Sequence, residues 1–427
     1  MISADTHIVH AGQLVTISID PADSAPRRGR DLASLNIIDD GAIAAKDGRI
    51  VWVGPTSDLP KAVSAVNDDR VIDAKGRVVT PGLIDPHSHP VFAEPRAHEF
   101  ELRALGKSYQ EIAAAGGGIK NSVEAVRSAD LESLVRMGRH TADRMLAHGT
   151  TTAEAKSGYG LSLEAEMKLL EAIRRVNESH PIDWVPTLLA AHEFPPEFEG
   201  ARDEYVRLIT DEILPIIAEH KLAEFNDVFF ESGVFDRMQT ESIQRRAAEL
   251  GFGLKFHVDQ LTDVGGAELA VSMKANSADH LEFVSESGVR ALAGSDTIAV
   301  MLPGATYFLD LQKRPPVRDM IERGVIIALA TDCNPGSNMS ESVPLAMNQA
   351  CVMYKMTPAE TLVAATLNAA HAVRRAHQIG TLAIGKQCDI VIWDVSDFRE
   401  IAYHYGVNLV HTVVKNGKAL VRNGEWA

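Results

Sequence analysis

Cysteine is scarce in this chain of 427 residues, with Cys333, Cys351 and Cys388 as the only three. Because no Cys-x-x-Cys pair occurs, neither a disulfide framework nor a thiolate zinc site is expected. The sequence also has no run near the roughly 18 apolar residues of a membrane span. Its start, MISADTHIVHAGQLV, lacks the basic and apolar regions of a signal peptide. We therefore expect a protein of the reducing cytoplasm with no membrane partner.

Positive charge is in short supply as well. The chain has 42 lysines and arginines against 58 aspartates and glutamates, a formal net charge of −16. Such a chain repels the phosphates of nucleic acids and anionic membrane surfaces, so neither is an expected partner. The global charge excludes no small substrate, because the charge inside a pocket can differ from it. Hydrophobic residues at 45% and charged residues at 23% are ordinary for a globular protein.

Both ends of the chain carry strand and turn patterns. AKDGRIVWVG (45–54) places Asp-Gly between two extended segments, and TVVKNGKALVRNG (412–424) does the same with Asn-Gly. Such dipeptides between apolar runs are typical of β-hairpins. CDIVIWDV (388–395) predicts a further strand. Since the chain is too long for one ordinary core, we expect a small β domain built from both ends and a larger central domain.

The central part alternates between short apolar runs and longer segments with helical spacing. In 131–148 and 241–251, for example, apolar residues recur at helical intervals. A doubly wound sheet also alternates in this way, but a count of eight runs favours a (β/α)8 barrel. The runs are 78–89, 149–157, 184–194, 226–233, 253–260, 275–283, 296–304 and 324–336.

Metal-binding side chains mark the ends of these runs. His87 and His89 end the first run, and residues two apart on a strand point the same way. In a barrel the carboxyl ends of all strands meet at one mouth. A single histidine is usually a surface or core residue, so the prediction depends on several converging. Together they would suit zinc, iron or manganese. The third, fifth, sixth and eighth runs end at His192, His257, His280 and Asp332.

This set also provides acid–base chemistry. Water bound to such a metal has its pKa lowered to about 7. Asp332 could bind the metal through one oxygen and accept the proton of the water through the other. His280 could orient the water or stabilise a developing oxyanion. The neighbouring Cys333 is not expected to be a nucleophile, because the adjacent aspartate raises a thiol pKa.

The positions of these residues resemble the amidohydrolase superfamily. Its members share a distorted barrel, a flanking β-sandwich from both termini, and His-x-His, His, His and Asp at strands one, five, six and eight. GTLAIGKQCDIVIWD (380–394) is similar to the segment that returns the chain to the sandwich. The resemblance implies a sandwich of residues 1–80 and 371–427 around a barrel of 81–370. Many binuclear members carry a carboxylated lysine at strand four, and DVFFESG (227–233) has none, which implies a single divalent or trivalent ion, zinc or iron.

Within the superfamily, nearly the whole chain is similar to the imidazolonepropionase family. The resemblance implies hydrolysis of 4-imidazolone-5-propanoate to N-formimino-L-glutamate in histidine degradation. A cytosine- or guanine-type deaminase would use the same frame and is the alternative. A metal-free scaffold protein is disfavoured, since every ligand position is filled. The motifs are HPVFAEPRAHEFELRALGKSYQEIAAAGGGI (89–119), EAKSGYGLSLEAEMKLL (154–170), KFHVDQL (255–261), SADHLE (277–282), MLPGATYFL (301–309) and ATDCNPGSN (330–338).

The same resemblance implies a role for individual residues. A guanidinium binds a carboxylate through two parallel hydrogen bonds, which suits Arg96. Some members have Glu at position 260, and Gln260 would leave proton transfer to Asp332 and His280. A homodimer is the default expectation for such an enzyme. The implied metal ligands are His87, His89, His257 and Asp332, and the implied catalytic residues are Asp332, His280 and Gln260. The implied substrate contacts are Arg96, Tyr109, Tyr159, His192, Gln260, Asn334, Gly336 and Ser337.

Overall fold

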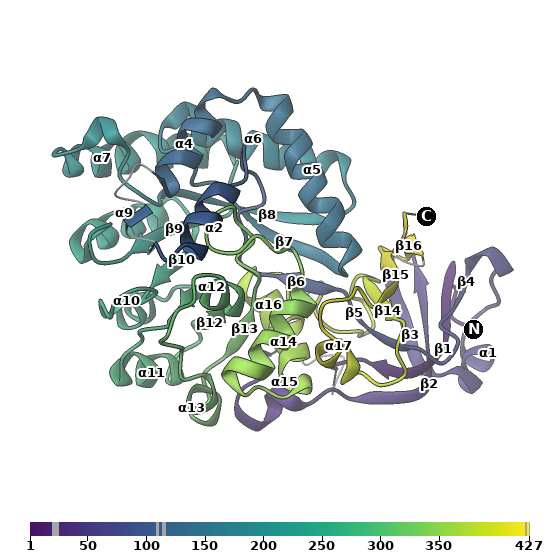
Figure 1. The fold of residues 1–427 in the computed structure, drawn as a ribbon. Coiled ribbons are helices and arrows are strands. Elements are labelled where there is room, and N and C mark those ends of the chain that lie inside the picture. Colours follow the sequence, from purple (N-terminus) through teal and green to yellow (C-terminus); the bar gives the residue numbers. More distant parts are fainter. Residues whose placement is uncertain (19–24, 108–110, 113–116, 423–424, 427) are drawn as a thin grey trace.

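Eight parallel strands form a barrel in the computed structural model, which describes residues 1–18, 25–107, 111–112, 117–422 and 425–426 (Figure 1). The strands pair in chain order, and each coincides with one predicted run, although β8 and β9 begin one residue before theirs. Hydrogen bonds from Asp332 N to His87 O (3.0 Å) and from His89 N to Cys333 O (2.9 Å) join the segments that directly follow the first and the last strand. The predicted eight-stranded barrel is confirmed. Its strands are β6 (Leu83–Asp85), β7 (Thr150–Lys156), β8 (Asp183–Ala191), β9 (Phe225–Phe230), β10 (Gly253–Val258), β11 (Ser277–His280), β12 (Ile298–Met301) and β13 (Ile327–Leu329).

Helices between the strands form the outer layer of the barrel (Figure 1). In α5 the buried residues recur at helical spacing, and Asp130 caps the start by accepting from Ser133 N at 2.7 Å. None of the helices that the structure describes is both long and apolar enough to cross a membrane. They are α2 (Ala97–Ala104), α4 (Ile119–Ser128), α5 (Leu131–Ala147), α6 (Leu163–Ser179), α7 (Arg202–Leu208), α8 (Leu214–His220), α9 (Arg237–Glu249), α10 (Gly266–Ser272), α11 (Glu286–Ala293), α12 (Pro303–Phe308), α13 (Val317–Glu322), α14 (Val343–Tyr354), α15 (Pro358–Ala364) and α16 (Leu367–Ala372).

A second sheet combines strands from both ends of the chain, as predicted. It runs in the order β17-β16-β15-β14-β5-β1-β2-β3, with β4 paired to β1. The antiparallel pair of β5 and β14 joins the N-terminal and C-terminal strands. The short helix α1 (Leu59–Ala62) contacts β2, whereas α17 (Glu400–Tyr403) packs against α14 and α15 of the barrel. The strands are β1 (Thr6–Val15), β2 (Ile37–Lys46), β3 (Arg49–Pro55), β4 (Val71–Asp73), β5 (Val78–Pro81), β14 (Ile390–Trp393), β15 (Val410–Lys415), β16 (Lys418–Arg422) and β17 (Glu425–Trp426).

Two tight turns fix the hairpins of this sheet. Asp47 and Gly48 have φ of 51° and 76°, and Asn416 and Gly417 have φ of 48° and 75°. Positive φ at both central residues is the type I′ geometry that matches the twist of the flanking strands. The dipeptides recognised in the sequence therefore make the turns that they predict.

Candidate active site

A cavity at the carboxyl ends of the barrel strands collects most of the predicted site residues. His87 is fully buried directly beside it, and Tyr109 lies outside the described residues. Apart from these two, every site residue predicted from the sequence lines the cavity. The lining consists of His89, Arg96, Ile119, Tyr159, His192, Phe229, His257, Gln260, Leu261, His280, Leu309, Asp332, Asn334, Gly336 and Ser337.

The imidazoles of His87 and His89 converge on the carboxylate of Asp332. Their Nε2 atoms lie 3.5 Å and 3.6 Å from Asp332 Oδ1. Two ligands that each lie about 2.1 Å from one tetrahedral ion are about 3.4 Å apart, so this spacing fits a shared metal. His87 with His257 and His280 forms a second such group, in which the possible ligand atoms lie within 4.8 Å of one another. The Nε2 atoms of His87 and His257 are buried and accept or donate no hydrogen bond among the described residues.

A buried carboxylate orients the imidazole of His87 through a hydrogen bond, and another lies close to that of His257. His87 Nδ1 lies 2.6 Å from Asp279 Oδ2, and His257 Nδ1 lies 2.8 Å from Asp227 Oδ2. A carboxylate at Nδ1 holds the proton there and leaves the Nε2 lone pair for a metal. Burial also lowers the pKa of His87 well below its usual value. The ring is therefore neutral, as a metal ligand must be.

Two lysines occupy the barrel interior beside these carboxylates. Lys156 Nζ lies 2.6 Å from Asp227 Oδ2 and 3.0 Å from Glu154 Oε2, and Lys255 Nζ lies 2.7 Å from the same Glu154 oxygen. Burial alone would lower the pKa of Lys156, but the attraction of Asp227 and Glu154 raises it above its ordinary value. Two ammonium groups thus balance much of the buried negative charge, which argues against a second cation at Glu154 and Asp279.

This buried ion network was missed in the sequence analysis. The signal for it was present, because charged residues inside otherwise apolar strands rarely lie buried without partners. Lys255 is two residues before His257 on β10, and Glu154 is two before Lys156 on β7, so each pair faces the same side. The sequence does not say which strands bring the opposite charges together.

The turn after β13 holds Asp332 in a fixed orientation. Asp332 has a left-handed φ of 55°, and its Oδ2 accepts a hydrogen bond from Ser337 Oγ at 3.0 Å. Asn334 closes the turn on itself: Oδ1 accepts from the N–H groups of Gly336 and Ser337, both at 2.8 Å, and Nδ2 donates to Asp332 O at 2.7 Å. Burial raises the pKa of the Asp332 carboxyl to about 7.

Arg96 presents a buried guanidinium to the same cavity. Only 5% of the residue is exposed, and its Nε lies 3.1 Å from Glu99 Oε2. The other Glu99 oxygen accepts from Gly118 N at 3.0 Å. Nη2 of Arg96 is buried and has no hydrogen-bond partner in the part of the chain that the structure describes. A charged donor in this situation calls for an anionic acceptor in the cavity.

The guanidinium of Arg96 packs against the backbone of Gly336. A Cβ atom on Gly336 would lie 2.1 Å from Arg96 Nη2. Any larger residue at position 336 would collide with the arginine, which explains on steric grounds why a glycine occupies this position. Arg96, in the loop after β6, and Gly336, in the loop after β13, therefore meet at the barrel mouth although they are far apart in the sequence.

His192 and Tyr159 form another part of the cavity wall. The His192 ring stacks on His89 with centroids 5.3 Å apart, and it lies 5.5 Å from the Tyr159 ring. Its Nδ1 donates to Gly158 O at 3.0 Å. Burial lowers the pKa of His192 to about 3, so the ring is neutral. Its Nε2 is then left as a hydrogen-bond acceptor for a ligand.

The loop that carries Tyr159 is held by the buried carboxylate of Glu166. This side chain accepts the backbone N–H groups of Gly158 (3.1 Å), Gly160 (2.8 Å) and Leu161 (2.8 Å). Leu161 has a left-handed φ of 50°, so the loop is tightly wound. Glu166 belongs to a quoted motif, but only the fold shows that it shapes the site.

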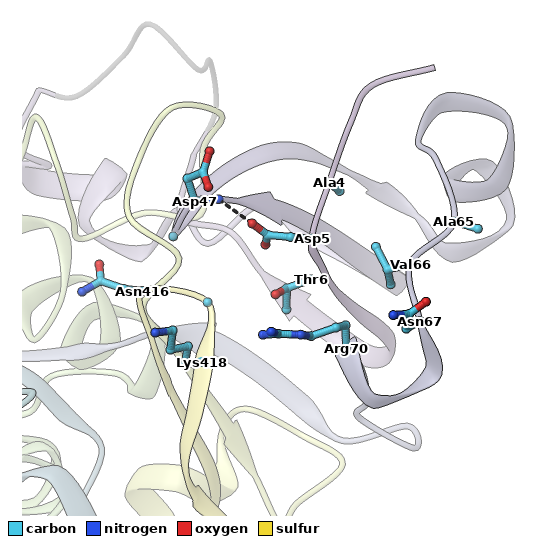
Figure 2. A pocket seen from close by; sticks show the side chains of 12 residues that line it. Ala4, Asp5, Thr6, Asp47, Ala65, Val66, Asn67, Arg70, Asn416 and Lys418 are labelled. Carbon is cyan, nitrogen blue, oxygen red and sulfur yellow. Dashed lines mark hydrogen bonds between the residues drawn. The ribbon is translucent and has the colours of Figure 1, made fainter.

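A second cleft, of about 660 Å³, lies in the β domain and has a different character. Figure 2 shows that it opens between Asp47, Asn416 and Lys418 on one side and Asn67 and Arg70 on the other. None of its described lining residues is a histidine, and its charged side chains are exposed. The cavity at the barrel mouth is therefore the candidate active site.

The chain is similar to known proteins in both sequence and fold. The amidohydrolase family matches residues 311–420. Proteins named imidazolonepropionase from Geobacillus kaustophilus, Brevibacillus brevis and Symbiobacterium thermophilum are 47%, 46% and 46% identical to it. These matches cover 97%, 98% and 99% of this chain and 97%, 99% and 98% of the relatives. Among solved structures, Escherichia coli guanine deaminase has a TM-score of 0.74 at 16% identity, covering 98% of this chain and 99% of its own. Likeness at that identity concerns the fold alone.

Proposed function

Because the chain belongs to the imidazolonepropionase family of amidohydrolases, we propose that it hydrolyses 4-imidazolone-5-propanoate to N-formimino-L-glutamate, a step of histidine degradation. The observation that carries the substrate assignment is Arg96, whose buried Nη2 has no hydrogen-bond partner among the described residues and lines the cavity of the convergent histidines. A substrate with a propanoate tail supplies the carboxylate that this guanidinium needs. Cytosine and guanine carry none.

One metal ion, zinc or iron, would be held by His87, His89, His257 and Asp332. The support is the spacing of 3.5 Å and 3.6 Å to Asp332 Oδ1 together with the carboxylates behind two of the rings. Bound there, the ion would supply hydroxide at neutral pH by lowering the pKa of water to about 7.

Asp332 would carry out the proton transfers, and His280 would stabilise the oxyanion. Asp332 accepts the proton of the attacking water while the water oxygen bonds to the ring carbonyl carbon. His280 donates a hydrogen bond to the oxyanion that forms on the former carbonyl oxygen. Asp332 then returns the proton to the ring nitrogen as the C–N bond breaks. Gln260 has an amide and cannot accept a proton at neutral pH, so its role is to orient the water or the carbonyl.

Arg96 with Tyr159 and Tyr109 would bind the propanoate carboxylate, and His192 would contact the imidazolone ring. Asn334, Gly336 and Ser337 would contact the product through the turn that follows β13. The amide of Asn334 is engaged within this turn, so its contribution is to hold the turn in shape.

The decisive test is a ring-opening assay on purified protein. Loss of imidazolonepropanoate and formation of formiminoglutamate are followed while zinc and iron are measured in the same sample. Parallel incubations with cytosine and guanine are analysed for ammonia. Ammonia from these bases without ring opening of imidazolonepropanoate would reject the proposal in favour of a deaminase.

The proposal extends to the organisation of the enzyme. A division into a barrel of residues 81–370 and a β domain of 1–80 and 371–427 is supported by the partners of β5 and β6, which belong to different sheets. We further propose that the enzyme acts in the cytoplasm as a homodimer. Light scattering on the purified protein tests its oligomeric state.

A further inference from the structure

Glu282, the last residue of the SADHLE motif, lies fully buried behind His280 and has no part in the chemistry above. Its Oε2 is 3.8 Å from His280 Nδ1. Neither atom has a hydrogen-bond partner among the described residues, and both are buried. The distance is about 1 Å longer than a hydrogen bond, so a small rotation of either side chain would join the two atoms.

The other oxygen of Glu282 ends a chain of hydroxyl groups from the protein core. Thr306 Oγ1 donates to Glu282 Oε1 at 2.9 Å, whereas its alternative acceptor, Leu302 O, is at 3.5 Å. The Tyr354 hydroxyl lies 2.8 Å from Thr306 Oγ1. Because a threonine hydroxyl has one proton to donate, Tyr354 is the donor to Thr306. The hydrogen bonds therefore point from α14 through α12 toward Glu282.

The surroundings of Glu282 favour its neutral form. No lysine or arginine forms an ion pair with it among the described residues, and the carboxylates of Asp332 and Glu231 act on it instead. Burial, with a smaller contribution from these two acids, raises the pKa of Glu282 to about 8. With Oε1 accepting from Thr306, the carboxylic proton lies on Oε2, which faces His280 Nδ1.

The backbone holds the pair in place at a conformational cost. His280 and Leu281 have φ of 81° and 70°, in the left-handed region that side chains with a Cβ seldom adopt. Leu281 is fully buried and its N–H donates to Val258 O at 3.1 Å. Two consecutive residues in this region persist only where the surroundings over-determine them. Their effect here is to turn Glu282 back beneath His280.

We propose that Glu282 is a positioning residue that donates a hydrogen bond to His280 Nδ1 and so keeps the proton of His280 on Nε2, facing the cavity. The inference rests on the proposed function, in which His280 donates to the oxyanion. A neutral imidazole can donate from Nε2 only when Nδ1 is the acceptor. Glu282 thus allows the neutral His280 to donate a hydrogen bond from Nε2, the nitrogen that faces the cavity.

Two substitutions distinguish a donating acid from a carboxylate. In Glu282→Gln the amide oxygen still accepts from Thr306 and the amide N–H can still donate to Nδ1, so kcat should stay within about threefold of wild type. Glu282→Met has similar length and no donor, so kcat should fall about 10- to 100-fold, the usual effect of losing such a partner, with KM and metal content unchanged. A Gln variant as impaired as the Met variant, or a fully active Met variant, would overturn the proposal.

The proton on His280 can be located without any substrate. NMR of zinc-loaded protein with ¹⁵N-labelled histidine, with His280→Asn to identify the signal, should give the Nε2–H tautomer in wild type and in Glu282→Gln. A proton on Nδ1 in wild type would overturn the proposal even if the Met variant did not fold. Absence of imidazolonepropanoate turnover by wild type would reject the proposed function instead, because the tautomer is measured independently.

Discussion

Replacement of Gly336 by alanine should displace the Arg96 guanidinium. The new Cβ would lie 2.1 Å from Nη2, 2.5 Å from Cζ and 2.8 Å from Nη1. Gly336 is not among the residues with positive φ, so alanine adds no backbone strain of its own. Its backbone is held by Asn334 Oδ1 on the N–H (2.8 Å) and by Arg103 Nη1 on the carbonyl (3.0 Å). The arginine side chain is the flexible partner and must move.

The size of the effect follows from the bonds that Arg96 can make. A hydrogen bond to a charged group contributes about 1.5–3 kcal/mol. At about 1.4 kcal/mol for each factor of ten, loss of one such bond to the propanoate should raise KM about 10- to 100-fold. The carboxylate is remote from the reacting carbonyl, so kcat should change much less.

Steady-state kinetics on four proteins test this prediction. They are wild type, Gly336→Ala, Arg96→Ala and the double variant. Since both single changes remove the same contact, Gly336→Ala should add little in the Arg96→Ala background. Gly294→Ala is the matched control, because a Cβ there would meet nothing nearer than 3.7 Å and its KM should not change. An unchanged KM in Gly336→Ala, or the same loss in both backgrounds, would refute the reasoning.

Three further predictions concern the metal site and its supports. Asp279→Asn should weaken metal binding about 10- to 100-fold in a chelator competition, because His87 Nδ1 loses its charged partner at 2.6 Å; equal affinity would contradict the assigned orientation. In the metal-free protein the pKa of Asp332 is raised to about 7, so metal must displace its proton at lower pH. The apparent affinity should therefore rise between about pH 5 and 7, by up to about tenfold per unit, and level off above; a flat profile in calorimetry would exclude this linkage. Glu166→Gln turns an amide N–H toward backbone N–H donors and should lower the free energy of unfolding by about 1–3 kcal/mol in denaturant unfolding. It should also raise KM, because the loop that carries Tyr159 loses its support. Unaltered unfolding would show that the carboxylate is dispensable.

Local patterns in the sequence were sufficient for the architecture. Asp47-Gly48 and Asn416-Gly417 predict hairpins because few residues tolerate two successive positive φ values. The alternation of apolar runs and helical spacing predicts the eight barrel strands, since each strand and helix must bury its own apolar face. Ligand-type residues at the ends of those runs, such as His87 and Asp332, predict the cavity because the strand ends share one mouth.

Contacts between distant strands were decided only by the tertiary structure. In the sequence there is no sign that the charges of Lys156, Lys255 and Glu154 belong together, because each lies in an apolar strand. Only the folded barrel brings them into ion pairs beneath the imidazoles. The sequence likewise gives no reason for Gly336 until Arg96 is seen against it, or for Glu282 until it lies behind His280. The physical reason is one of range. Turn preferences and hydrophobic periodicity act over a few neighbouring residues, so they can be recognised in the sequence. The environment of a buried charge depends instead on strand register, barrel closure and left-handed turns, which bring residues remote in the sequence within a few ångströms.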